Sequence, residues 1–193
     1  MALLDSVPAS ILVVLDEAYC EYINKADYPD GIALQKRYAN LIITRTFSKA
    51  YGLGGLRVGY SISDPVIADM LNRVRQPFNV TSLSLAAAQA ALDDEAYLAE
   101  SVALNDAGMQ QLESGFTHLG LNYIKSAANF ITFETPCLAS EMNQQLLQLG
   151  VIVRPVANYG LVNHLSVSIG LEDENTQFLQ ALTKIIETSK SDK

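Results

Sequence analysis

Three short apolar runs in the first third of the chain constrain its fold most strongly. They lie at Ile11–Leu15, Leu41–Thr44 and Leu56–Ile62, and none is long enough to be a helix buried on all sides. An unbroken run of this length is typical of a strand in a parallel sheet whose two faces are both covered. A polar stretch and a short helical segment, Ile32–Tyr38, separate the first two runs. The sequence therefore predicts a parallel α/β unit in this part of the chain.

Helical patterns follow the third apolar run. Asp64 is a suitable N-cap and Pro65 suits a first helical turn, so a helix is predicted from Asp64 to Arg75. Two more helical stretches cover Ser82–Asp93 and Glu95–Leu119, as two helices or as one bent helix.

Beyond Gly120 the pattern changes to short strands that alternate with amphipathic helices. Leu165, Val167 and Ile169 are expected on one face of a strand, with Ser166 and Ser168 on the other. The other elements predicted here are strands at Phe130–Phe133 and Val151–Pro155 and helices at Ser140–Leu149 and Glu172–Thr188. We therefore expect residues 1–100 to be part of an α/β domain and residues 101–193 to form a small α+β domain.

Composition excludes several classes of function. The net charge of the 193 residues is −8 and no run is rich in lysine or arginine, which argues against nucleic acid or an anionic membrane as a partner. No apolar run approaches the roughly 20 residues of a membrane span, and the basic start of a signal peptide is absent, so a cytoplasmic location is expected. Cys20 and Cys137 lie far apart, as do His118 and His164, so we expect free thiols and no metal site.

The first polar cluster is Asp16-Glu-Ala-Tyr19, directly after the first predicted strand. Ligands of open α/β sheets bind beyond the carboxyl ends of the strands. A carboxylate there needs a cationic partner if it is buried, and a protonated pyridine nitrogen would be one. The alternative is an ordinary helix N-cap or loop carboxylate.

The second cluster, Thr44–Tyr60, follows the second predicted strand and contains Lys49. A lysine in a desolvated pocket can act as an amine nucleophile. Thr46, Ser48 and Arg57 could donate hydrogen bonds to a phosphate, and glycines at 52, 54 and 55 allow close approach of the backbone. The segment fits neither a GxGxxG dinucleotide motif nor a P-loop. These neighbours favour a functional lysine over a surface one.

The stretch from Thr46 to Tyr60 resembles the lysine signature of the aspartate-aminotransferase superfamily of pyridoxal-phosphate enzymes. Together with Val14–Tyr19, Val74–Asn79 and Gly160–Leu165 it is similar to the histidinol-phosphate aminotransferase family. The resemblance covers essentially the whole chain and corresponds to about the carboxyl-terminal half of a family member. It implies an α/β fold, comprising the end of the large cofactor-binding domain and a small α+β domain.

The resemblance also implies roles for individual residues. Lys49 would carry the pyridoxal phosphate as a Schiff base and later move the proton. Asp16 would pair with the pyridine nitrogen and Tyr19 with the ring oxygen. The cofactor phosphate would be held by Thr46, Ser48 and Arg57. The implied reaction converts histidinol phosphate and 2-oxoglutarate to imidazole acetol phosphate and glutamate in histidine biosynthesis, within a cytoplasmic homodimer.

Two departures from the family's pattern leave alternatives open. The family's first half is not represented, so the chain alone is expected to be poorly active. Ser166 replaces an arginine that grips the substrate's anionic group, which leaves Arg154 either as a substrate ligand or as a partner of a nearby carboxylate. The alternatives are a non-catalytic remnant or interaction domain, and a related decarboxylase of threonine phosphate.

Overall fold

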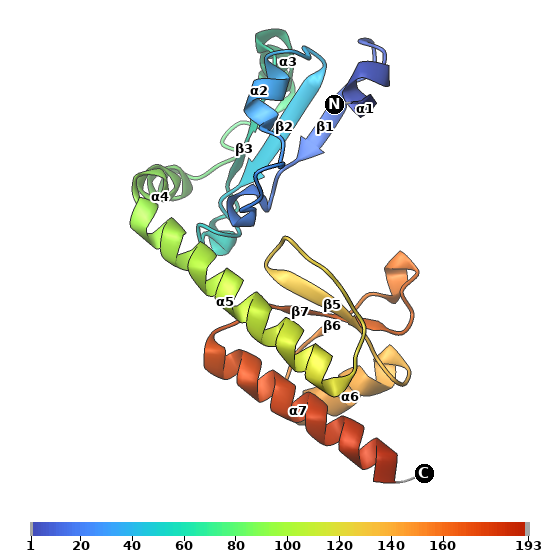
Figure 1. The fold of residues 1–193 in the computed structure, drawn as a ribbon. Helices are drawn as coiled ribbons and strands as arrows, with labels where there is room; N and C mark the ends of the chain where they lie inside the picture. Colours follow the sequence, from blue (N-terminus) through green and yellow to red (C-terminus); the bar gives the residue numbers. More distant parts are fainter. Residues whose placement is uncertain (1, 192–193) are drawn as a thin grey trace. The chain divides into compact units, whose positions relative to one another are not determined.

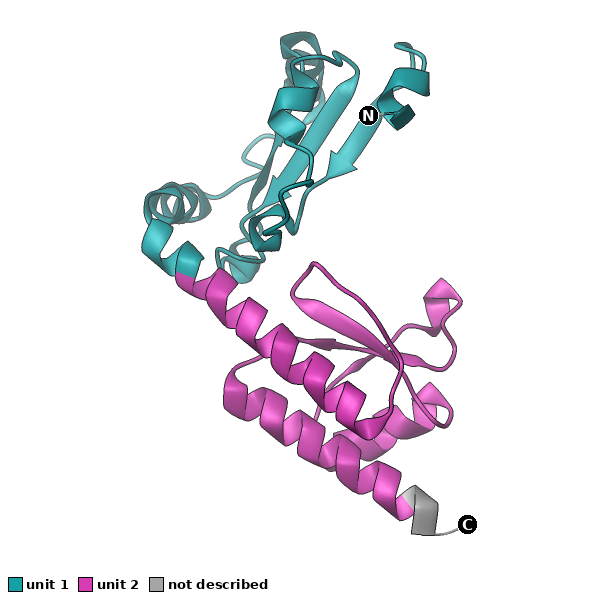
Figure 2. Ribbon diagram, in the orientation of Figure 1, with its two compact units in different colours: residues 1–99 teal, residues 100–193 magenta. Residues whose placement is uncertain are grey.

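The computed structural model describes residues 2–191 of the protein. It divides into two compact units, Met1–Ala99 and Glu100–Lys193 (Figure 2). Each unit contains its own buried apolar clusters. Every helix within residues 2–191 falls short of the length and apolar character that crossing a membrane would require.

The first unit is built on a three-stranded sheet in the order β1-β2-β3 (Figure 1). β1 (Val13–Asp16) and β2 (Leu41–Thr46) run parallel, with Asp16 opposite Thr44. The remaining elements are α1 (Ala2–Ser6), η1 (Cys20–Tyr22), α2 (Gly31–Gln35), η2 (Gly54–Leu56), β3 (Gly59–Ile62), α3 (Pro65–Val74) and α4 (Ser82–Asp93).

The prediction of an all-parallel sheet is wrong for the third strand. β3 pairs antiparallel with β2, and Leu56 belongs to the 3-10 turn η2 rather than to a strand. A parallel neighbour usually needs a crossover α-helix, whereas the segment between Thr46 and Gly59 contains only the 3-10 turn η2. The chain therefore returns beside β2 in the opposite direction.

Burial of the strands also differs from the expectation in β1 and in β3, where only Ile62 is half-buried. Leu41 and Ile43 of β2 are 1% and 0% exposed, as an inner strand requires. Val14 of β1 is 61% exposed, so β1 is not buried on both faces in this chain. Burial alternates along β1, so the face that carries Val14 and Asp16 is uncovered within the described residues, while Val13 and Leu15 are half-buried.

Local capping explains where the helices begin. The Asp64 carboxylate accepts a hydrogen bond from the Val66 amide at 2.9 Å, with Pro65 in the first turn of α3, as predicted. Thr81 caps α4, and the Asp94 carboxylate accepts from the Tyr97 amide at 3.0 Å at the start of the next helix. The two stretches around Asp94 are therefore two separate helices.

The second unit contains an antiparallel sheet in the order β4-β5-β7-β6. Helix α5 (Glu95–Leu119) begins in the first unit and continues into this one. The other elements are β4 (Tyr123–Ile124), β5 (Phe130–Glu134), α6 (Ala139–Gln148), β6 (Arg154–Pro155), η3 (Ala157–Tyr159), β7 (His164–Ser168) and α7 (Glu172–Ser191). The strand predicted at Val151–Pro155 is reduced to its last two residues, and β4 lay outside the prediction.

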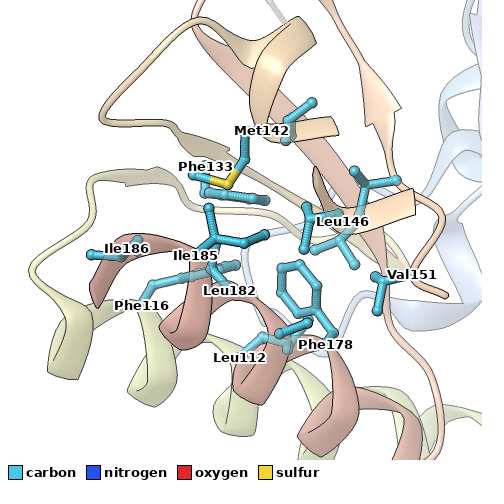
Figure 3. Packing of buried hydrophobic residues seen from close by; sticks show 14 of the residues in the cluster. Leu112, Phe116, Phe133, Met142, Leu146, Val151, Phe178, Leu182, Ile185 and Ile186 are labelled. Carbon is cyan, nitrogen blue, oxygen red and sulfur yellow. The ribbon is translucent and has the colours of Figure 1, made fainter. Parts of the chain in front are cut away.

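The core of this unit forms between the helices and the sheet. In Figure 3, side chains from α5 and α7 point toward those of β5 and α6. The ring of Phe116 stacks on that of Phe133 with centroids 4.7 Å apart, and Phe178 meets both rings edge-on. Leu165 and Val167 are buried, whereas Ser166 and Ser168 are not, which confirms the alternation predicted for β7.

Candidate functional site

The carboxyl ends of β1 and β2 lie side by side because the two strands are parallel. An open cavity of about 320 Å³ lies at this edge of the sheet. The residues that line it come from both strand ends and from the loop after β2: Asp16, Ala18, Thr44, Arg45, Thr46, Ser48, Lys49 and Arg57. Five of the side chains that the sequence singled out therefore share one cavity.

Asp16 is the last residue of β1, and its carboxylate organises the turn that follows. The Oδ1 atom accepts hydrogen bonds from the Ala18 amide at 3.1 Å and from the Thr44 hydroxyl at 3.3 Å. The side chain is exposed within this chain. Asp16 does not cap the next helix, since Tyr19 occupies the N-cap position of η1. The carboxylate is thus fixed at the cavity and keeps capacity for a cationic partner.

Thr46, Ser48 and Arg57 are linked to one another. The Ser48 amide donates to the Thr46 hydroxyl at 3.1 Å, and Arg57 Nη1 donates to Ser48 Oγ at 3.5 Å and to the Gly54 carbonyl at 2.8 Å. Arg57 has a φ of 52°, in the left-handed region that non-glycine residues rarely adopt. Two hydroxyls and a guanidinium therefore converge at one end of the cavity, a donor set suited to an anion.

Lys49 lies in the turn after β2, where the Gly52 amide donates to the Lys49 carbonyl at 2.9 Å. Its ammonium nitrogen is 5.2 Å from the centroid of the Tyr19 ring, so Tyr19 contacts the site through Lys49 rather than as part of the cavity wall. Gly52 has a φ of +70°, and a Cβ there would come within 2.5 Å of the Tyr97 hydroxyl. The backbone conformation requires glycine at 52, and a Cβ there would also displace the Tyr97 hydroxyl.

Glu17 and Arg45 are two residues to which the sequence assigned no role. Glu17 is 2% exposed, and its Oε2 accepts hydrogen bonds from Arg45 Nε at 3.0 Å and Nη2 at 2.8 Å. Burial by itself lowers the pKa of Arg45, but hydrogen bonds to Glu17 and Tyr60 outweigh this effect and raise it. The sequence offered one signal for the pair, since Glu17 directly follows Asp16 and Arg45 stands between Thr44 and Thr46.

The two thiols are free, as predicted. Burial, followed by the nearby Glu21 carboxylate, raises the pKa of Cys20 to about 12. Burial also raises the pKa of Cys137. A thiol needs a lowered pKa to act as a nucleophile near neutral pH, so neither cysteine competes with Lys49 for that role.

Arg154 and Ser166 belong to the second unit and are direct cross-strand partners of β6 and β7. Arg154 is exposed; its Nη2 donates to the Tyr159 hydroxyl at 3.4 Å, and its guanidinium carbon is 5.9 Å from the ring centroid. The ion pairs recorded within the described residues are Arg45–Glu17 and Arg73–Asp69. The alternative in which Arg154 pairs with a carboxylate is therefore not observed.

Comparison with known proteins gives consistent matches. The family model described as aminotransferase class I and II matches residues 1–182. Histidinol-phosphate aminotransferase 2 of Pseudomonas fluorescens is 62% identical over 183 residues, which cover 95% of this chain and 50% of that relative. The chain thus spans about half the length of the curated relatives it matches.

Solved structures agree with this relationship. Histidinol-phosphate aminotransferase from Sinorhizobium meliloti, in complex with pyridoxal-5'-phosphate, gives a TM-score of 0.87 at 33% identity and covers 97% of this chain and 52% of that one. L-threonine-O-3-phosphate decarboxylase from Porphyromonas gingivalis has the same fold, with a TM-score of 0.84 at 22% identity over 96% of this chain and 58% of that one.

Proposed function

Because this chain belongs to the class I and II aminotransferase family, we propose that its strand-end cavity binds pyridoxal phosphate and serves a transaminase reaction. The superfamily and fold class predicted from the sequence are confirmed by the family and structural matches. The proposed donor is histidinol phosphate and the proposed acceptor is 2-oxoglutarate, since curated relatives at 62% and 61% identity are histidinol-phosphate aminotransferases.

The chemistry of the cavity fits this cofactor. Pyridoxal phosphate carries an aldehyde, a pyridine nitrogen and a phosphate, and when bound it supplies an electron sink. Lys49 presents an amine, Asp16 a carboxylate, and Thr46, Ser48 and Arg57 present the anion donors. The observation that carries the proposal is that these three kinds of group line a single cavity.

Each side chain has a proposed task. Lys49 would bond to the aldehyde carbon of the cofactor, with the aldehyde oxygen leaving as water, and would later move a proton. Asp16, anchored by Ala18 and Thr44, keeps the pyridine nitrogen protonated. Tyr19 donates to the ring oxygen from its place beside Lys49. Thr46, Ser48 and Arg57 hold the phosphate, with the guanidinium contributing the charge-assisted contact.

We propose that Arg154 binds the anionic group of the substrate. Its guanidinium is held by an aromatic neighbour and by no carboxylate within the described part of the chain. Ser166 stands opposite it and brings no charge. A homodimer in the cytoplasm is proposed from the family resemblance, and sedimentation of the purified protein tests the dimer.

The proposal is tested by trapping the cofactor. After addition of pyridoxal phosphate and borohydride, peptide mapping is expected to find the label on Lys49. Lys49→Ala is expected to abolish both the label and the visible absorbance of the bound cofactor. Lys36→Ala, which changes an exposed lysine of the same unit, serves as the matched control. Label spread evenly over surface lysines would refute the assignment.

A second candidate reaction acts on a phosphorylated amino acid instead of histidinol phosphate. Decarboxylation of threonine phosphate uses the same fold in one solved relative. Assays for glutamate formed from 2-oxoglutarate and for carbon dioxide released from threonine phosphate distinguish the two reactions. If neither product forms although pyridoxal phosphate is bound at Lys49, the non-catalytic alternative is favoured.

A further inference from the structure

The Glu17–Arg45 ion pair is the most buried charged contact of the first unit. The Glu17 and Arg45 side chains are 1% and 21% exposed. Two nitrogens of the Arg45 guanidinium donate hydrogen bonds to one Glu17 carboxylate oxygen. Burying a carboxylate is costly unless a cation compensates it. Arg45 therefore fixes Glu17, and Glu17 in turn restricts the position of the guanidinium.

The pair joins the same two strand ends that carry the cavity residues. The Glu17 amide donates to the Thr44 carbonyl at 2.9 Å, which extends the β1–β2 ladder by one residue past Asp16. Arg45 lines the cavity beside Thr44 and Thr46, whereas Glu17 is not part of the lining. The ion pair thus connects the two backbone segments that present Asp16, Thr44 and Thr46, and it fixes the Arg45 side chain at the cavity.

Gly31 provides the space that Glu17 occupies. A Cβ at this position would lie 2.1 Å from Glu17 Oε1 and 2.8 Å from Glu17 Cδ. Gly31 is the first residue of α2 and is itself buried, so the start of this helix also encloses the Glu17 carboxylate. Any side chain at 31 would push Glu17 away from its present position.

We infer that Glu17 and Arg45 are positioning residues for the cofactor cavity: their ion pair sets the register and spacing of the strand ends that present Asp16 and Thr46. The inference rests on the proposed function and adds Glu17, which lies outside the cavity lining and acts through Arg45. A displacement of about 1 Å can cost about a hundredfold in a process that needs fixed geometry. A change at this pair is therefore expected to alter cofactor binding.

The experiment measures pyridoxal phosphate affinity by absorbance titration and melting temperature without cofactor. Glu17→Gln keeps the shape of the side chain but removes its charge, and Arg45→Lys keeps the charge but loses the two-point contact. Both variants are expected to weaken pyridoxal phosphate about tenfold to a hundredfold and to shift the pH dependence of the bound cofactor's absorbance. Gly31→Ala displaces Glu17 without altering any charge and is expected to act in the same direction.

Asp69→Asn is the matched control, because it breaks an ion pair whose side chains are 74% and 55% exposed. Asp69→Asn is expected to change neither the pyridoxal phosphate affinity nor the melting temperature. If Glu17→Gln lowers the melting temperature but binds the cofactor as tightly as the unaltered protein, the pair is merely structural and the inference is overturned. If Glu17→Gln does not fold, the cofactor affinity and melting temperature of Arg45→Lys and Gly31→Ala test the inference instead. Absence of binding by the unaltered protein refutes the proposed function itself, and the inference with it.

Discussion

Neighbouring residues of identical charge have opposite environments at the end of β1. Asp16 is exposed beside the cavity and is held by two weak donors, whereas Glu17 is buried and paired with an arginine. The period of a strand explains the difference, because consecutive side chains point to opposite faces. The roles of the two carboxylates follow from the faces they occupy rather than from their own chemistry.

A restored arginine at position 166 tests the proposed role of Arg154. Ser166→Arg places a second guanidinium opposite Arg154 across β6 and β7. One additional charge-assisted hydrogen bond is worth about 1.5–3 kcal/mol, so KM for a phosphorylated donor is expected to fall about tenfold to a hundredfold. The measurement is steady-state kinetics with histidinol phosphate, with inorganic phosphate as a competing anion.

Ser168→Arg is the control for this change, because Ser168 lies on the same face of β7 but pairs with Phe130. Combining Ser166→Arg with Arg154→Ala is expected to remove most of the gain. An equal gain from Ser168→Arg would show that any added positive charge suffices and that Arg154 has no special role.

The Cys20 thiol is expected to be unreactive near neutral pH. Its pKa is raised to about 12 by burial and by Glu21, so the thiolate is scarce at pH 8. The folded state favours the protonated Cys20 thiol. The contribution of this thiol to the free energy of unfolding is therefore present below the ordinary pKa of 9.0 and is lost as the pH rises toward about 12. Iodoacetamide labelling at pH 8, followed by mass spectrometry, is expected to be slow and to accelerate in urea. Rapid labelling of the folded protein would contradict the assigned environment.

At the scale of elements, α5 and α7 approach closely where α5 has glycine. Gln111 of α5 donates to the Thr176 hydroxyl of α7 at 2.9 Å. A Cβ at Gly108 would lie 2.4 Å from Ile169 Cγ2, and one at Gly115 would lie 2.5 Å from Leu179 Cδ2. Both glycines allow the close packing of α5 because they lack a side chain, and neither has an unusual φ angle.

The two positions are expected to respond differently to alanine. Gly108→Ala also meets the Asn175 amide nitrogen at 2.9 Å and the Gly170 carbonyl at 3.3 Å, and is expected to destabilise by about 1–3 kcal/mol. At Gly115 the clash is with the end of a leucine side chain that can rotate, and alanine gains about 1 kcal/mol of helix propensity, so the net change is expected to stay within about 1 kcal/mol. Urea denaturation measures both, and equal destabilisation would contradict the difference.

At the scale of the whole molecule, the cores of the two units differ in extent. The apolar cluster of the second unit runs from Leu112 to Ile186 and is enclosed by its own helices and sheet. The first unit has two smaller clusters, and apolar residues of α3 such as Met70 and Val74 remain 59% and 79% exposed in this chain. The second unit therefore has a continuous hydrophobic core of its own, which independent folding requires.

We predict that residues 100–193 fold alone. The expected outcome is one cooperative unfolding transition and a dispersed amide NMR spectrum, since the continuous core lies inside this range. Residues 1–99, prepared in the same way, are expected to bind a hydrophobic dye and to aggregate more readily, because of their exposed apolar surface. A molten second unit would show that its core depends on the rest of the chain.

The sequence by itself determined the type and position of most elements and the chemical nature of the site. Local rules suffice for this: Asp64 and Pro65 start a helix, alternation places Leu165 and Val167 inward, and Lys49 stands among hydroxyls and glycines. Tertiary structure decided what depends on contacts between distant segments. The antiparallel direction of β3, the exposure of Val14 and the burial of Glu17 against Arg45 and Gly31 follow from pairing and packing that no local pattern specifies.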